Sequence, residues 1–199
     1  MKFIFLAGLL ASPCLAAHTA EGPWDTWELT AETGYLKNVG SNTEIDYEII
    51  PTQLTLRSPV ILTLWKDESG PERLIVRNRF SALFEAITAG PEDYYIGLSG
   101  APSLEYWFTN ETSAFFSIGG GFGWTNSAGG PDAKGDNREA LGQDFTFNWF
   151  SQLGLRHEIC DNVSLLGSLY FTHHSNLGLT DPNPGIDALG FTVGCSWRF

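Results

Sequence analysis

The sequence has no long apolar run beyond its N-terminus. After residue 16, no stretch approaches the roughly 20 apolar residues that a membrane-spanning helix needs, so any membrane contact must be made by strands or by a peripheral surface. Cationic residues are also scarce, because 11 Lys and Arg stand against 23 Asp and Glu, for a formal net charge of -12. This charge argues against nucleic acid as a partner.

The N-terminus has the pattern of a signal peptide. Lys2 provides a charged start, and the apolar run of residues 3–11 is too short to cross a bilayer as a helix. Small residues flank Leu15 and predict cleavage after Ala16. We therefore expect a signal peptide at residues 1–16 and an exported domain at residues 17–199.

Cysteine is rare, and each cysteine has its own interpretation. A lipid anchor on Cys14 is the alternative to cleavage, but Pro13 stands where a lipoprotein signal has a small residue. The mature chain keeps Cys160 and Cys195. Export would permit a disulfide between them, but the register inferred below separates them, and we expect two unpaired thiols whose role stays open.

Alternation with a period of two indicates β-strands along the mature chain. The composition, with 43% hydrophobic and 14% aromatic residues, is too apolar for disorder and predicts one domain. The clearest strand covers residues 144–159. Its apolar parity is Phe145, Phe147, Trp149, Leu153 and Leu155, and its polar parity is Thr146, Asn148, Gln152, Arg156 and Glu158.

Further segments bring the total to about eight strands. They cover residues 27–35, 50–64, 74–85, 94–108 and 114–124, and two segments before the C-terminus. Pro51 and Pro59 interrupt the second of them. Eight strands is the smallest number usual for an outer-membrane barrel. The expected fold is therefore all-β, an eight-stranded antiparallel transmembrane β-barrel of the outer-membrane type.

Charges on the polar face favour a barrel over a soluble β-sandwich. They are Arg77, Arg79, Glu85, Arg156 and Glu158. A small hydrated lumen accommodates such charges, whereas a dry sandwich core would reject them. A sandwich whose charged face meets solvent remains the alternative. Four tryptophans are expected in the aromatic girdles of a barrel, namely Trp65, Trp107, Trp124 and Trp149.

The C-terminus resembles the signal by which outer-membrane barrels are recognised for insertion. A glycine at Gly194 is followed by spaced aromatic residues and a terminal Phe199, and Phe191, Val193 and Trp197 share the parity of that last residue. The resemblance implies the barrel assembly machinery as a partner. The plain alternative is a last strand without such a role, and both interpretations lead to a barrel.

The segment that joins the last two strands contains the candidate catalytic residues. His173 and Ser175 share the apolar parity of their strand and are expected on the lipid-facing side, while His174 has the opposite parity. Polar residues on that face are costly at mid-membrane, so we expect them at the outer rim. A hairpin that pairs Ser175 with Asp187 would make His173 the diagonal neighbour of the carboxylate, about 7 to 8 Å away.

Serine, histidine and a carboxylate are together the parts of a hydrolase. The histidine removes the serine proton, and the acid holds the imidazole and stabilises its charged form. Asp181 is the fallback for the acid. A polar rim without chemistry is the plain alternative. A metal site from His173, His174 and the two aspartates is disfavoured, because the alternate parities of the histidines point them apart.

This segment also resembles a family signature. Phe171-Thr172-His173-His174-Ser175-Asn176-Leu177-Gly178, followed by Asn183-Pro184-Gly185-Ile186, is similar to the signature of the outer-membrane lipid A 3-O-deacylases, the PagL-type family of eight-stranded barrels. The resemblance implies that His173 is the base, Ser175 the nucleophile and Asp187 the acid. Asp187 departs from the family pattern, in which the acid is a glutamate, so its carboxylate lies one methylene closer to the backbone.

An oxyanion hole must be supplied by the same loop. Donors have to converge where the ester oxygen becomes negative, and the candidates are Asn176, Asn183 and the backbone at Gly178. The resemblance favours Asn183. Both asparagines could instead be ordinary turn formers.

The expected function is that of a serine esterase at the outer leaflet of the bacterial outer membrane. By the resemblance, its substrate is lipid A, or whole lipopolysaccharide, and it removes the 3-O-linked acyl chain without a cofactor or a metal. Two alternatives remain, a non-catalytic structural or adhesive barrel and a hydrolase of phospholipid type. The oligomeric state stays open, with a homodimer as one option.

Overall fold

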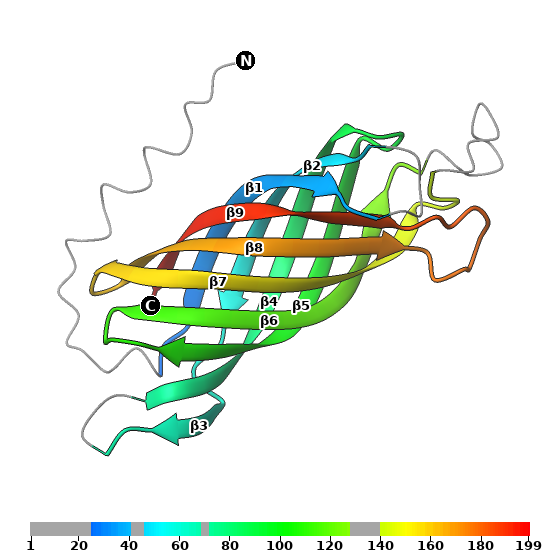
Figure 1. Cartoon of the computed structure of the whole chain (residues 1–199). Helices are drawn as coiled ribbons and strands as arrows, with labels where there is room; N and C mark the ends of the chain where they lie inside the picture. The colour runs from blue at the N-terminus through cyan, green and yellow to red at the C-terminus, as the bar shows by residue number, and fades with distance from the viewer. Residues whose placement is uncertain (1–24, 41–45, 69–71, 128–139) are drawn as a thin grey trace.

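Nine β-strands and no helix are found in the described residues of the computed structural model, which are 25–40, 46–68, 72–127 and 140–199 (Figure 1). The strands are β1 (Glu28–Asn38), β2 (Glu48–Arg57), β3 (Leu62–Lys66), β4 (Glu72–Ala89), β5 (Tyr94–Trp107), β6 (Thr112–Thr125), β7 (Phe145–Cys160), β8 (Val163–Ser175) and β9 (Ile186–Arg198). Within these ranges no helix has the length and apolar character needed to cross a membrane.

The sheet closes into an eight-stranded antiparallel barrel, as predicted. Neighbouring strands follow the order β2-β1-β9-β8-β7-β6-β5-β4-β3, and β2 also pairs with β4. β2 and β3 both pair with β4, one after the other along its length. Together they occupy one strand position of the barrel, which is interrupted around Pro59. Pro51 stays inside β2, at a gap in its pairing with β1. Both positions suit a residue that has no N–H to donate to a ladder.

Charged side chains fill the barrel interior. Arg57 Nη1 lies 3.1 Å from Glu105 Oε1, and Arg77 Nη1 lies 3.6 Å from Glu28 Oε2, with all four side chains fully buried. Arg156 also pairs with Glu28. Buried charges are tolerated only when they are paired. The interior is therefore a network of ion pairs.

Large apolar side chains cover the outside of the barrel. They come from every strand, and examples are Leu29, Leu54, Phe80, Leu98, Phe122, Leu153, Leu169 and Phe191. This distribution is the reverse of a soluble β-sandwich, which buries its apolar face. The sandwich alternative is therefore wrong, and the outside is a surface for lipid.

Three of the four tryptophans predicted for the aromatic girdles face outward, as a girdle requires, and the prediction is wrong for the fourth. Trp65, Trp124 and Trp149 are about half exposed on the outside. Trp107 is fully buried, because it shares the inward parity of Tyr95 and Glu105 on β5. A single aromatic residue at a strand end does not reveal its face when the alternation of the whole strand is weak.

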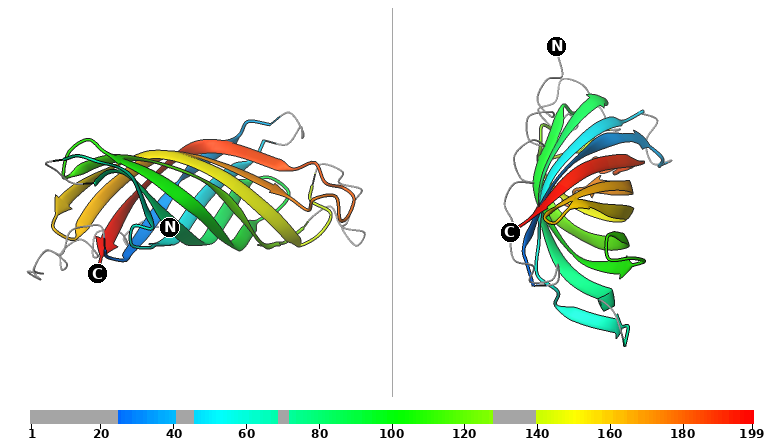
Figure 2. Two further views of the ribbon diagram at one scale, coloured as in Figure 1. Left: turned by 90° about the horizontal axis from the view of Figure 1, so that it is seen from below. Right: turned by 90° about the vertical axis from the view of Figure 1, so that its left-hand side faces the viewer.

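Neighbouring strands of the barrel are strongly staggered. A path of Cα partners that starts at His173 and passes once around the barrel returns to β8 at Val163, the opposite end of that strand. Figure 2 shows the corresponding tilt of the strands. A row of paired residues that begins near the Ser175 end of β8 therefore moves toward the opposite end of the barrel as it crosses the neighbouring strands.

The cysteine predictions are only partly correct. Cys195 is a free thiol, and its Cα partner on β8 is Leu165. Cys160 is disulfide-bonded, so the expectation of an unpaired thiol is wrong at that position. That expectation considered only a pairing with Cys195.

Candidate active site

A hydrogen-bonded His–Asp pair lies on the outside of the barrel. His173 on β8 and Asp187 on β9 are direct Cα partners, and His173 Nδ1 lies 2.7 Å from Asp187 Oδ1. The two side chains are 22% and 18% exposed. In Figure 1 the loop between β8 and β9 lies at the end of the barrel opposite the C-terminus. The pair therefore lies at one rim of the barrel, on the lipid-facing surface.

The register differs by two residues from the one predicted. We expected Ser175 opposite Asp187 and His173 on the diagonal, but the last pair of the β8–β9 ladder is His174 with Ile186. A slip of two residues leaves every side chain on the same face, so the apolar pattern cannot distinguish the two registers. The observed register places the imidazole closer to the acid, and a short aspartate reaches it.

Ser175 lies on the same face as His173, just past the end of the ladder to β9. Its Cα partner is Phe147 on β7, and its side chain is largely buried. No hydrogen bond of its hydroxyl is found among the described residues. The structure therefore brings base and acid into contact and places the candidate nucleophile two residues from the base. His174 points into the barrel, where its Nε2 lies 2.8 Å from Glu85 Oε2, as its parity predicted.

Close packing holds the His–Asp pair from two sides. A Cβ atom at Gly185 would lie 3.0 Å from His173 Cε1, and one at Gly40 would lie 2.8 Å from Asp187 Oδ2. The Val39 N–H also donates to the backbone carbonyl of Asp187. Gly185 belongs to the recognised motif, but no local signal could have found Gly40, because only the β1–β9 pairing brings it to the site.

The residues 176–185, here called the site loop, are held by their own hydrogen bonds. Asn176 Nδ2 donates to the carbonyls of Thr180 and Pro182, at 2.7 and 3.3 Å, and Asn176 Oδ1 accepts from the Gly178 N–H. The backbone N–H of Asn176 donates to Asn183 Oδ1 at 2.8 Å. These bonds fix the loop directly behind Ser175.

The same bonds separate the three oxyanion candidates. The Asn176 amide and the Gly178 N–H are already engaged inside the loop. Asn183 uses only its oxygen, and its Nδ2 makes no hydrogen bond within the described residues. The amide of Asn183 is therefore the side-chain donor that the loop leaves available.

A metal site finds no support in the geometry. His173 and His174 lie on opposite faces of β8, and no group of three or more His, Cys, Asp or Glu side chains converges within the described ranges. Asp181, the fallback acid, is exposed in the site loop, while Asp187 contacts the imidazole directly.

Comparison with known proteins agrees with this architecture. The crystal structure of the outer membrane enzyme PagL is similar, with a TM-score of 0.53 and 20% identity over 86% of this chain and 99% of that chain. The crystal structure of Neisserial surface protein A has a TM-score of 0.58 at 9% identity, covering 87% and 97% of the two chains. At these identities the structures establish the shared barrel fold alone. Curated proteins give no match.

A sequence family covers almost the whole chain. The family model described as lipid A 3-O-deacylase (PagL) matches residues 19–196, which include β1 to β8, the site loop and β9 as far as Ser196. The chain belongs to the lipid A 3-O-deacylase (PagL) family.

Proposed function

We propose that this protein is a serine esterase of the outer membrane that removes the 3-O-linked acyl chain of lipid A. The observation that carries the proposal is the 2.7 Å contact between His173 Nδ1 and Asp187 Oδ1, on the lipid-facing side and two residues from Ser175. Family membership supports lipid A as the substrate. A catalytic pair that faces lipid suits an ester whose acyl chains are in the bilayer.

The geometry defines how the proton would move. Because Asp187 accepts the hydrogen of His173 Nδ1, the imidazole keeps Nε2 as a free acceptor. Nε2 would take the hydroxyl proton while Ser175 Oγ attacks the ester carbonyl, and would then give it to the departing sugar oxygen. Water would release the fatty acid from the acyl-enzyme by the same sequence in reverse. No step requires a cofactor.

The tetrahedral intermediate needs a donor for its negative oxygen, and we assign this role to Asn183 Nδ2. Asn183→Asp keeps an oxygen that accepts the Asn176 N–H and removes the amide donor. We expect this variant to lower kcat by roughly 10²- to 10³-fold with little change in KM. Steady-state kinetics with purified lipopolysaccharide measures both constants. Unchanged kcat would remove Asn183 from the mechanism and leave it as a loop residue.

The substrate is tested by mass spectrometry of lipid A from cells with and without the protein. We expect loss of one hydroxyacyl group from lipid A when the protein is present. A change in phospholipids without a change in lipid A would favour the phospholipid alternative, and no change in either would favour a structural or adhesive barrel. The same cells, fractionated, test the proposed location in the outer membrane. Fractionation of cells depleted of the barrel assembly machinery tests the proposed insertion by it.

A further inference from the structure

Two consecutive histidines at the end of β8 each contact a carboxylate, on opposite faces of the sheet. His173 contacts Asp187 outside the barrel, and His174 Nε2 lies 2.8 Å from Glu85 Oε2 inside it. Both side chains of the inner pair are almost completely buried. The mechanism proposed above uses the outer pair only, so the inner pair has no role in it.

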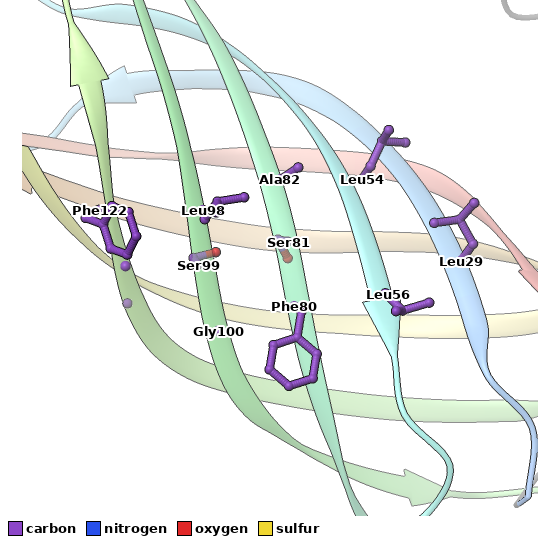
Figure 3. Close-up of a pocket in the computed structure, with 12 residues that line it drawn as sticks. Leu29, Leu54, Leu56, Phe80, Ser81, Ala82, Leu98, Ser99, Gly100 and Phe122 are labelled. Atoms are coloured by element: carbon purple, nitrogen blue, oxygen red, sulfur yellow. The ribbon is translucent and has the colours of Figure 1, made fainter.

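Glu85 reaches the interior because it has the inward parity of β4. Figure 3 shows Phe80 and Ala82 on the outer side of this strand, with Ser81 between them on the inner side. Glu85 is four residues after Ser81 and therefore shares its face. His174 has the inward parity of β8, so both side chains extend into the lumen.

The inner pair crosses the full width of the barrel. In the closed sheet, β8 is four places from β4 through β7, β6 and β5, and also four places through β9, β1 and β2. Two strands of an eight-stranded barrel cannot be farther apart. The contact of Glu85 with His174, here called the cross-barrel pair, therefore joins opposite walls.

The cross-barrel pair is separate from the Arg–Glu network of the interior. Within the described part of the chain, Glu85 has no ion-pair partner other than His174. Tyr95 packs against the imidazole with ring centroids 4.3 Å apart, and Thr172 Oγ1 lies 3.2 Å from His174 Nε2. A buried charged pair adds little net stability compared with apolar side chains of the same volume. The geometry that the pair imposes explains its presence better than stability does.

The end of β8 has a neighbouring strand on one side only where the candidate nucleophile lies. The ladder to β9 ends at His174 and Ile186, and Ser175 is paired only with Phe147 on β7. A strand end that is held on one side can twist about its own axis, and this twist swings the side chains of its two faces in opposite directions. Fixing His174 inside the barrel therefore restricts His173 and Ser175 outside it.

We propose that Glu85 and His174 are positioning residues, which hold the end of β8 so that His173 and Ser175 keep their catalytic geometry. The inference rests on the proposed esterase function, because it concerns the reverse face of the same strand. Neither side chain of the cross-barrel pair faces the lipid, so both act through the backbone of β8. Misplacement of reacting groups by about 1 Å slows an enzyme on the order of 100-fold.

Replacement of both members of the cross-barrel pair tests the proposal. One substitution alone would leave a buried polar group without its partner and destabilise the fold, whereas apolar side chains of similar volume at both positions are often neutral for stability. We expect Glu85→Met with His174→Phe to keep the thermal stability of the wild type. With purified lipopolysaccharide we expect kcat to fall about 10- to 100-fold and KM to stay nearly unchanged, because the substrate meets the outer face.

Labelling with a long-chain alkyl fluorophosphonate separates positioning from folding. Ser175 Oγ attacks the phosphorus, fluoride leaves and His173 takes the hydroxyl proton, so the labelling rate measures how well the base activates the serine. The final extent of labelling counts the correctly folded barrels. We expect the double variant to reach the extent of the wild type, at a rate reduced by the same factor as kcat.

Two control variants accompany this measurement. The reversed pair, Glu85→His with His174→Glu, rebuilds the contact between the same walls and is expected to recover most of the lost rate. Glu158 and Arg198 form a 2.8 Å ion pair between β7 and β9, far from the site. Glu158→Met with Arg198→Met is expected to leave kcat and the labelling rate unchanged.

The outcomes separate the positioning role from the esterase function. Labelling of the Glu85 and His174 double variant at the wild-type rate would overturn the inference, even if fewer barrels fold, because the pair would then serve folding alone. Equal slowing in the Glu158 and Arg198 variant would also overturn it, since loss of any ion pair would have the same effect. Wild-type protein that neither hydrolyses lipopolysaccharide nor reacts with the fluorophosphonate would instead remove the proposed function.

Discussion

Replacement of Ser175 by alanine is expected to abolish the release of hydroxy-fatty acid from purified lipopolysaccharide. The hydroxyl is the only group that the proposed mechanism uses to attack the ester, and loss of a nucleophile in a serine hydrolase lowers kcat by a factor on the order of 10⁶. Binding should be nearly unchanged, because the substitution removes one oxygen from a site otherwise formed by neighbouring strands. Fatty-acid release measured by mass spectrometry, with equal amounts of folded barrel, gives the result.

Three further variants make this test more specific. Ser151→Ala on β7 removes another lipid-facing hydroxyl from the neighbouring strand, where the Cα partner of Ser151 is Phe171, and is expected to be fully active. His173→Ala is expected to be as inactive as Ser175→Ala, and the double variant no worse, because the members of a triad act as a unit. Undiminished release by Ser175→Ala would contradict the serine mechanism outright.

The second large effect is expected at Asp187. Asp187→Asn preserves the size of the side chain but removes the charge that holds His173 in the Nδ1–H tautomer, and an amide in the acid position permits the wrong tautomer. We expect kcat to fall roughly 10³- to 10⁴-fold. Because the same residue pairs β9 with β8, thermal unfolding of the variant must be compared with that of the wild type before the kinetic loss is assigned to chemistry.

Asp187→Glu tests the departure from the family pattern. The observed register places His173 directly opposite the acid, and the shorter aspartate already spans the gap with a 2.7 Å hydrogen bond. Gly40 packs closely against the carboxylate, so little room is left for an extra methylene. We expect Asp187→Glu to be less active than the wild type but more active than Asp187→Asn. A glutamate variant with higher activity than the wild type would show that aspartate is a compromise at this position.

Several elements could be predicted from the sequence because they depend on local alternation. Residues 144–159 and 74–85 show their two faces directly, and the structure buries the predicted charges Arg77, Arg79 and Arg156. Pro59 marked the interruption between β2 and β3. Trp107 was assigned to the wrong face, and Cys160 to the wrong bonding state, because each depends on surroundings that its local sequence does not reveal.

The candidate site was predictable in composition but not in geometry. Parity placed His173, Ser175 and Asp187 on one lipid-facing side, and the motif placed Asn176, Gly178 and Asn183 in the loop. Which of the three loop residues keeps a free donor depended on hydrogen bonds that only the folded site loop displays.

The sequence by itself determined which face each residue of the last two strands occupies, because a period of two is a property of the extended backbone. Only the tertiary structure decided the register, since a slip of two residues changes contacts without changing faces. That register sets His173 against Asp187, and the pairing of β1 with β9 brings Gly40 against the carboxylate. Neither relationship is local, and both result from closing eight tilted strands on one another.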